Sequence, residues 1–194
     1  MNLNGKRIIL GSKSPRRREL LAGLNIPFEI DTATLFDEDS AAPGCNPADI
    51  PSRMSEGKSL GFHRPLADDE ILITSDTLVF CDGLVLGKPH SREDAIRMLH
   101  MLSGNVHTVI TAVTIRSNSR TDTFTDEAKV FFNKLTDEEI VYYVDNFKPF
   151  DKAGSYGVQE WIGYVGISKI EGSFYTVMGL PVALLYQHLL PFLK

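Results

Sequence analysis

The chain has 194 residues, of which 43% are hydrophobic and 23% charged, and its formal net charge at pH 7 is −5. These values are typical of a globular protein and exclude a largely disordered chain. The acidic balance argues against general binding to a nucleic-acid backbone, which requires a broad positive surface. The two cysteines, Cys45 and Cys81, lack the spacing of a zinc ribbon or disulfide framework. We therefore expect one enzyme-sized unit in the reducing cytoplasm, neither exported nor inserted in a membrane.

The N-terminal part predicts a strand, a turn and a helix. Residues 6–10 (KRIIL) are typical of a short buried strand. Ser14 and Pro15 are the residue types expected at the N-cap and first position of the helix that follows. Residues 31–51 lack periodicity and contain Pro and Gly, which predicts a long loop, and a helix is expected over about 52–62.

The middle of the chain predicts a hairpin, a helix and two further strands. Apolar runs flank Asp82 and Gly83, a pair typical of a two-residue hairpin turn. Residues 91–104 begin with an S-x-x-D pattern and end at a glycine, which predicts a helix. Residues 106–117 and 121–135 alternate in polarity, as antiparallel strands do.

The C-terminal part completes the expected fold. Thr136 and Glu139 have the spacing of a capping box, which predicts a helix over residues 135–147. Residues 151–190 are expected to form a Gly-rich loop, extended segments and a closing helix. This order of elements predicts an α/β fold with a mixed, partly antiparallel sheet.

Three consecutive arginines, Arg16 to Arg18, stand in the first turn of the first predicted helix. A helix N-terminus presents N–H groups and the positive end of a dipole, so further cations are costly there unless an anion binds. At about 100° per residue, Arg17 lies on the apolar stripe, Arg16 flanks it and Arg18 faces solvent. We expect Arg16 and Arg17 to bind an anion. The alternative is a solvated basic patch that pairs with nearby carboxylates.

Asp76 interrupts a strongly apolar predicted strand. An ionised carboxylate there needs an ion pair, hydrogen bonds or a metal; the alternative is an aspartate that caps a turn at the end of the strand. The two-residue hairpin turn sets a register that brings Lys88 opposite Thr77, one position from Asp76. A lysine is thus expected near Asp76, on the same face if Gly87 forms a bulge.

Other patterns carry less information about function. The five histidines have no metal-ligand spacing, and the HExxH, GxSxG and P-loop patterns are missing from the sequence. Zinc and serine hydrolases are therefore disfavoured. The run KAGSYG, residues 152–157, could cradle phosphates through backbone N–H groups, but a plain turn is the alternative.

The segments SKSPRR, SDTLV, LGKP, LSGNVHTVITAV, DKAGSYGVQ and EGSFYTVMGLP occur in this order between about Ile8 and Leu185. This ordered set resembles the Maf family of nucleoside triphosphate pyrophosphatases. The resemblance implies an α/β Maf/ITPase-like fold, in which a mixed twisted sheet flanked by helices surrounds a deep central cleft. A single domain over residues 1–194, with room for two lobes around the cleft, is implied as well.

The resemblance also implies an activity. The protein would be a hydrolase of the dTTP/UTP branch, usually a homodimer, and would cleave its substrate between the α and β phosphates. The products would be a nucleoside monophosphate and pyrophosphate. The implied cofactor is a divalent cation, Mg²⁺ or Mn²⁺.

Individual positions receive roles from the same resemblance. It implies that Asp76 is catalytic and that Asp76 and Glu38 bind the metal. The implied phosphate-binding residues are Ser14, Arg16, Arg17, Lys58 and Lys88, and the implied specificity residues are Arg16, Thr77 and Gln159. The glutamine side chain offers both a donor and an acceptor, which suits the O4 and N3–H edge of thymine and uracil.

Two other functions are compatible with the sequence. One is a pyrophosphatase that acts on 7-methyl-GTP or a wider range of modified nucleotides. The other is a non-enzymatic regulator of cell division that binds nucleotides or nucleic acid. The negative net charge and the local clustering of basic residues disfavour the second.

Overall fold

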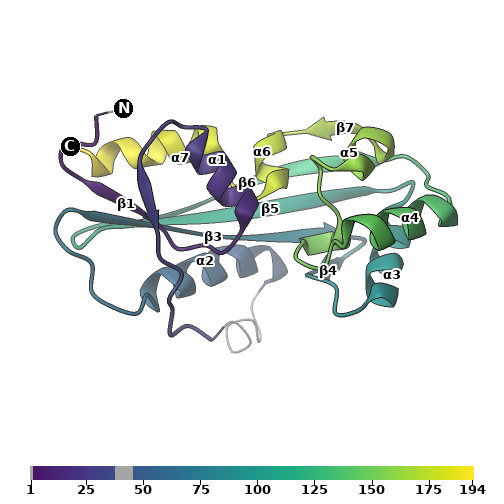
Figure 1. The fold of residues 1–194 in the computed structure, drawn as a ribbon, viewed down its shortest axis with the longest axis horizontal. Helices are drawn as coiled ribbons and strands as arrows, with labels where there is room; N and C mark the ends of the chain where they lie inside the picture. Colours follow the sequence, from purple (N-terminus) through teal and green to yellow (C-terminus); the bar gives the residue numbers. More distant parts are fainter. Residues whose placement is uncertain (1, 38–45) are drawn as a thin grey trace. The chain divides into compact units, whose positions relative to one another are not determined.

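The computed structural model describes residues 2–37 and 46–194 (Figure 1). Within them, seven strands form one mixed sheet with the order β2-β1-β3-β5-β6-β7, and β4 pairs with β3. The strands are β1 (Arg7–Leu10), β2 (Phe28–Ile30), β3 (Glu70–Cys81), β4 (Leu84–Leu86), β5 (Val106–Arg116), β6 (Thr121–Phe132) and β7 (Ile167–Glu171). The α-helices are α1 (Pro15–Ala22), α2 (Ile50–Leu60), α3 (Arg92–Leu102), α4 (Asp137–Phe147), α5 (Trp161–Gly166), α6 (Phe174–Met178) and α7 (Val182–Leu189).

The chain folds as two compact units. Unit 1 consists of Met1–Asp76, Thr111–Asp126 and Gly179–Lys194, and unit 2 consists of Thr77–Ile110 and Glu127–Met178. Strands β3, β5 and β6 each contribute residues to both units. The predicted α/β class with a mixed sheet flanked by helices is confirmed. The single domain and the deep cleft stay predictions.

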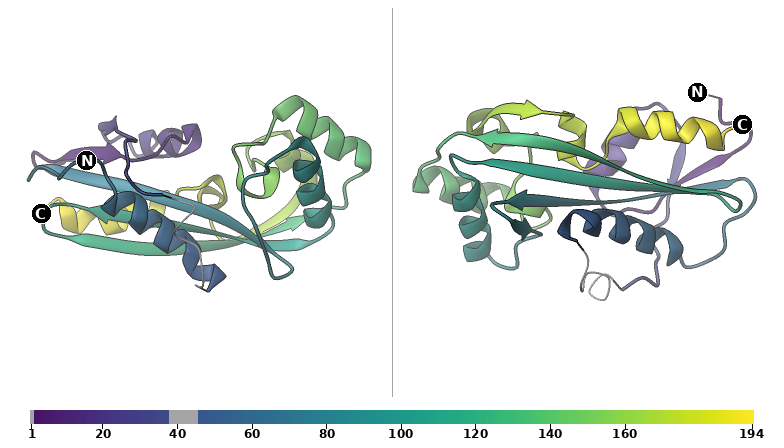
Figure 2. Two further views of the ribbon diagram at one scale, coloured as in Figure 1. Left: turned by 90° about the horizontal axis from the view of Figure 1, so that it is seen from below. Right: turned by 180° about the vertical axis from the view of Figure 1, so that it is seen from behind.

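Unit 1 is organised around three parallel strands, β2, β1 and the first half of β3. β1 pairs in parallel with β2 and with β3, and Leu10 lies opposite Ile73. Helix α2 covers one face of these strands and helices α1 and α7 cover the other (Figures 1 and 2). Because both faces are covered, the first half of β3 is continuously buried, and residues 8–10 of β1 and 71–73 of β3 form buried apolar runs.

Glu70, at the start of β3, is a buried carboxylate held by two arginines of unit 1. Arg64 Nη1 and Nη2 donate to its two carboxylate oxygens at 2.6 and 2.9 Å, and Arg7 Nη2 donates at 2.9 Å. The hydrogen bond from Arg64 is the largest effect and lowers the pKa of Glu70 to about 2, although burial acts in the opposite direction.

This carboxylate predicts a loss of stability in acid. Its pKa in the folded state is depressed, so it stabilises the fold above its ordinary value of 4.5, and that stability disappears as the pH falls toward about 2. We expect Glu70→Gln to lower the free energy of unfolding by about 3 kcal/mol near neutral pH, because Arg64 loses its charged partner. Urea denaturation at neutral pH and at about pH 3 measures the effect. An equal acid-induced loss in wild type and variant would contradict it.

Unit 2 contains the predicted hairpin. Cys81 pairs with Leu84 in an antiparallel ladder that extends to Leu86. Asp82 and Gly83 form the turn with φ values of 49° and 76°, as a type I′ turn requires. The two-residue turn and the predicted pairing of Cys81 with Leu84 are therefore confirmed.

Three helices begin at the predicted caps. The side chains of Ser14, Ser91 and Thr136 each accept a hydrogen bond from a backbone N–H in the first turn of α1, α3 and α4. At the start of α4, the capping box is complete because Glu139 also accepts from the Thr136 N–H.

Three expectations about elements were wrong. Helix α2 begins at Ile50, inside the predicted loop, and follows a 3-10 turn at Pro47–Asp49. Trp161–Gly166 and Phe174–Met178 are helical where extended segments were expected. The two helices have only six and five residues, which is too short a window for helical periodicity to be recognised in the sequence. The short strand β2 was also missed, and it depends on parallel pairing with β1.

Candidate active site

The first turn of α1 follows the carboxyl end of β1 through a short loop. The Ser14 Oγ accepts a hydrogen bond from the Arg17 backbone N–H at 3.4 Å. Arg16 and Arg17 are half-buried and Arg18 is exposed, which matches the predicted orientation of the three arginines. The first turn contains no acidic residue, so the positive charges of the arginines add to the positive end of the helix dipole there.

The Arg17 side chain is anchored to the strand that carries Asp76. Its Nε donates to the Gly179 carbonyl oxygen at 2.8 Å, and the Ser75 Oγ donates to the same oxygen at 3.3 Å. Gly179 has a φ of 111°, a conformation that favours glycine. The Gly179 carbonyl oxygen therefore links Arg17, at the start of α1, to Ser75, the residue before Asp76. All of these residues belong to unit 1.

Asp76 forms an ion pair with a lysine from α2. Its Oδ1 lies 2.6 Å from Lys58 Nζ, and the two side chains are only 15% and 16% exposed. Asp76 lies within β3, not at its end, so the turn-capping alternative was wrong. The ion pair needed by this carboxylate is present, and Lys58 provides it.

A buried hydrogen-bond network explains why Lys58 meets Asp76. Ser55 Oγ donates to the Thr74 carbonyl oxygen at 3.1 Å, and Thr74 Oγ1 donates to the Ser55 carbonyl oxygen at 2.7 Å. Lys58 lies about one helical turn after Ser55, on the same side of α2. Asp76 lies on the same face of β3 as Thr74, because alternate residues of a strand share a face. These two reciprocal hydrogen bonds therefore place Lys58 of α2 beside Asp76 of β3.

The donor set around Asp76 fits one kind of metal site. The described residues contain no group of three or more His, Cys, Asp or Glu side chains that could hold a metal. The second expected ligand, Glu38, lies outside the described residues. Protein sites for Mg²⁺ often use one or two carboxylates, with substrate phosphates and water completing the shell. Asp76 fits this type of site as one oxygen ligand.

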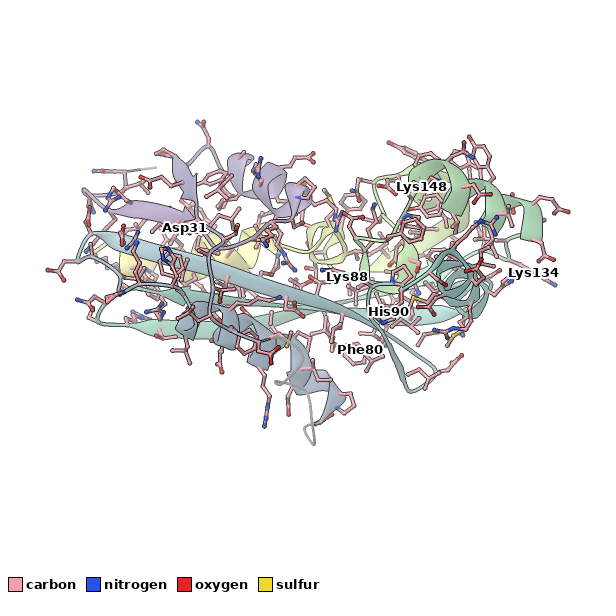
Figure 3. All side chains as sticks on the ribbon, turned by 60° about the horizontal axis from the view of Figure 1, so that its bottom comes forward. Asp31, Phe80, Lys88, His90, Lys134 and Lys148 are labelled. Atoms are coloured by element: carbon pink, nitrogen blue, oxygen red, sulfur yellow. The ribbon has the colours of Figure 1, made fainter. Side chains whose placement is uncertain are left out.

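Unit 2 holds the other candidate residues. Thr77 is half-buried on β3, and Lys88 is exposed on the segment that follows β4 (Figure 3). The β3–β4 ladder ends at Leu86, so the expected positions of Lys88 opposite Thr77 and of a bulge at Gly87 stay predictions.

The run KAGSYG acts as a tight turn. Gly154 and Ser155 have φ values of 67° and 60°. The Gly154 N–H donates to the Gly87 carbonyl oxygen at 3.0 Å, and the Ser155 N–H donates to the Lys152 carbonyl oxygen at 3.1 Å. Because these N–H groups already have protein acceptors, the plain turn is favoured over the phosphate cradle.

Gln159 lies in a turn beside a buried lysine, Lys152, whose ion pairs sequence reasoning missed. Lys152 Nζ lies 2.8 Å from Asp151 Oδ1 and 3.1 Å from Glu160 Oε1, and the Lys152 side chain is only 8% exposed. The signal available in the sequence was a lysine beside an aspartate at the start of a Gly-rich run. Gln159 Oε1 is shielded from solvent and accepts no hydrogen bond from the described residues.

None of the helices in the described part of the chain has the length and hydropathy needed to cross a membrane.

Comparison with known proteins gives one consistent result. A family model described as "Maf-like protein" matches residues 7–192. A protein of Parabacteroides distasonis named dTTP/UTP pyrophosphatase is 50% identical over 188 residues, which cover 97% of each chain. A Porphyromonas gingivalis protein of the same name is 49% identical over 193 residues, 98% of this chain and 96% of its own. Another from Bacteroides thetaiotaomicron is 47% identical over 188 residues, 97% of each chain.

Proposed function

Because the chain belongs to the Maf-like protein family, we propose that it is a pyrophosphatase that hydrolyses dTTP and UTP between the α and β phosphates. Relatives that bear this activity in their names are 47% to 50% identical over nearly the whole chain. The observation that carries the proposal is the shielded Lys58–Asp76 pair, with Oδ1 2.6 Å from Nζ. A carboxylate that a lysine holds in place can accept a proton from a water molecule beside a polyanionic substrate.

In this mechanism Asp76 accepts a proton from the water that attacks the α phosphate. Lys58 orients the carboxylate through its ammonium group and supplies positive charge. Arg16, Arg17 and the N-terminus of α1 bind phosphate oxygens, and these donors favour the charge that develops on the leaving pyrophosphate.

We assign one further phosphate contact and the selection of the base to residues of unit 2. Lys88 binds phosphate, and Thr77 and Gln159 select the base. The O4 of thymine and uracil accepts a hydrogen bond, and their N3–H donates one, so a glutamine side chain can bind both groups.

We further propose that the enzyme requires Mg²⁺ or Mn²⁺ and that Asp76 is one ligand. A divalent cation supplies charge neutralisation at the phosphates. We also propose that the protein is a homodimer in the cytoplasm, as the family resemblance implies.

A nucleotide panel tests the function. The purified chain is incubated with dTTP, UTP, CTP or 7-methyl-GTP, with Mg²⁺, Mn²⁺ or EDTA, and both monophosphate and pyrophosphate are quantified. We expect metal-dependent release of pyrophosphate, with kcat/KM for dTTP and UTP at least about tenfold above the other two nucleotides. Release of orthophosphate would refute the proposed bond. A preference for 7-methyl-GTP would replace the proposed substrate.

A further inference from the structure

Gln159 is carried by a short turn of unit 2. The Glu160 N–H donates to the Gly157 carbonyl oxygen at 2.9 Å, which closes the turn over residues 157–160. Within the described residues, the buried Gln159 Oε1 accepts no hydrogen bond. An unsatisfied buried acceptor is costly, on the order of 1–3 kcal/mol, so its presence calls for a donor beyond the described residues, which a bound base can provide.

The Tyr143 hydroxyl, from α4, binds both ends of this turn. It accepts a hydrogen bond from the Gly157 N–H at 2.9 Å and donates its proton to Glu160 Oε2. Burial first, and then the hydrogen bond to Glu160, raise the pKa of Tyr143. The hydroxyl therefore keeps its proton at neutral pH and remains a donor to the carboxylate.

Lys152 holds the other oxygen of the same carboxylate. Its Nζ lies 3.1 Å from Glu160 Oε1, and its second partner, Asp151 Oδ1, lies at 2.8 Å. Both Glu160 oxygens are thus bound, one by a hydroxyl and one by an ammonium. Buried charges rarely add net stability compared with apolar residues, but they can hold one geometry against alternatives.

Two glycines let the turn pack without side chains. A Cβ at Gly157 would lie 2.8 Å from Glu160 Cδ, and a Cβ at Gly163 would overlap the carbonyl oxygen of Val158. Gly163, in α5, therefore packs directly against the backbone that precedes Gln159. The backbone on both sides of Gln159 is fixed by contacts within unit 2.

We propose that Tyr143, Glu160 and Lys152 form a clamp that positions Gln159 Oε1 to accept a hydrogen bond from the N3–H of thymine or uracil. The inference rests on the proposed function. Cytosine has no hydrogen on N3, so a fixed acceptor discriminates against CTP, whereas a mobile amide could turn its NH₂ group toward the base. The clamp residues are positioning residues, because they act on the base through Gln159.

Tyr143→Phe tests the clamp with little change in volume. The phenyl ring keeps the stacking on Phe147, whose centroid lies 5.1 Å away, and only the hydroxyl is lost. We expect KM for dTTP to rise about tenfold, kcat to stay within about twofold, and the dTTP over CTP ratio of kcat/KM to fall about tenfold. Glu160→Gln should shift the same three values in the same direction. Tyr142→Phe is the matched control, because it removes a hydroxyl from an exposed neighbour on the same helix.

A double-variant cycle separates positioning from folding. Gln159→Ala should lose the same discrimination, and adding Tyr143→Phe to it should cause no further loss. Additive losses would overturn the inference, as would a Tyr143→Phe protein with a lower melting temperature but wild-type discrimination. If the wild type itself fails to prefer dTTP over CTP, the proposed function fails. A wild type that prefers dTTP, with unchanged Tyr143→Phe and Glu160→Gln variants, overturns the clamp alone.

Discussion

Asp76→Asn is expected to lower kcat for dTTP hydrolysis by about a thousandfold, since an amide cannot accept the proton of the attacking water. The amide keeps the shape of the carboxylate, so the fold should persist. Lys58 Nζ, 2.6 Å from Oδ1 in the wild type, would lose the negative charge of the Asp76 carboxylate. Its ammonium would then be more available to phosphate, and KM for dTTP should stay equal or fall. Pyrophosphate release under single-turnover and steady-state conditions measures both constants.

Asp82→Asn is the control for this experiment. Asp82 occupies the hairpin turn at the end of the same strand with a φ of 49°, and asparagine before glycine suits that turn equally well. The control should retain wild-type kcat. If Asp76→Asn keeps more than about a tenth of the activity with an unchanged melting temperature, Asp76 does not carry the proton transfer.

The sequence predicted best the features that depend on near neighbours. A serine cap before Pro15, a capping box at Thr136 and an aspartate–glycine turn each act within about four residues, and all three are present. The hairpin register followed from the turn alone. Local geometry also predicted the orientation of the arginines, because helical spacing relates them to Leu20 and Leu21, both of which are buried.

Contacts between distant residues could not be derived in the same way. The sequence indicated that Asp76 needs a partner, but hairpin geometry pointed to Lys88 and not to Lys58. The meeting of Lys58 and Asp76 depends on the Ser55–Thr74 hydrogen bonds, which join a helix to a strand. Only the family resemblance had assigned Lys58 to the site.

Packing also overrides local preference in the C-terminal region. Helix α5 contains Gly163 and Gly166, and glycine costs about 1 kcal/mol in a helix relative to alanine. Gly163 is explained by its close contact with the Val158 backbone, which a side chain at position 163 would prevent. The ion pair between the buried Lys152 and the half-buried Glu160 was also missed, because each residue alone is typical of a surface loop.

Arg17→Ala is expected to lower kcat/KM for dTTP by about 30-fold, equivalent to about 2 kcal/mol, through the loss of charged hydrogen bonds to phosphate. Inhibition by inorganic pyrophosphate should weaken by a similar factor, since this ligand presents phosphates without a base. The melting temperature should also fall, because Arg17 Nε donates to the Gly179 carbonyl oxygen at 2.8 Å in the folded protein. Arg17→Lys keeps the charge but not the planar fork, so its loss of kcat/KM should be intermediate.

Arg18→Ala is the matched control for Arg17→Ala, because it removes the same side chain from the adjacent, exposed position of α1. Its kcat/KM for dTTP and its inhibition by pyrophosphate should stay within about twofold of the wild type. The contrast assigns anion binding to the side of α1 that faces the strand of Asp76, not to the triplet as a general basic patch. Equal losses in the two variants would mean that long-range charge, and not position, accounts for the effect of Arg17.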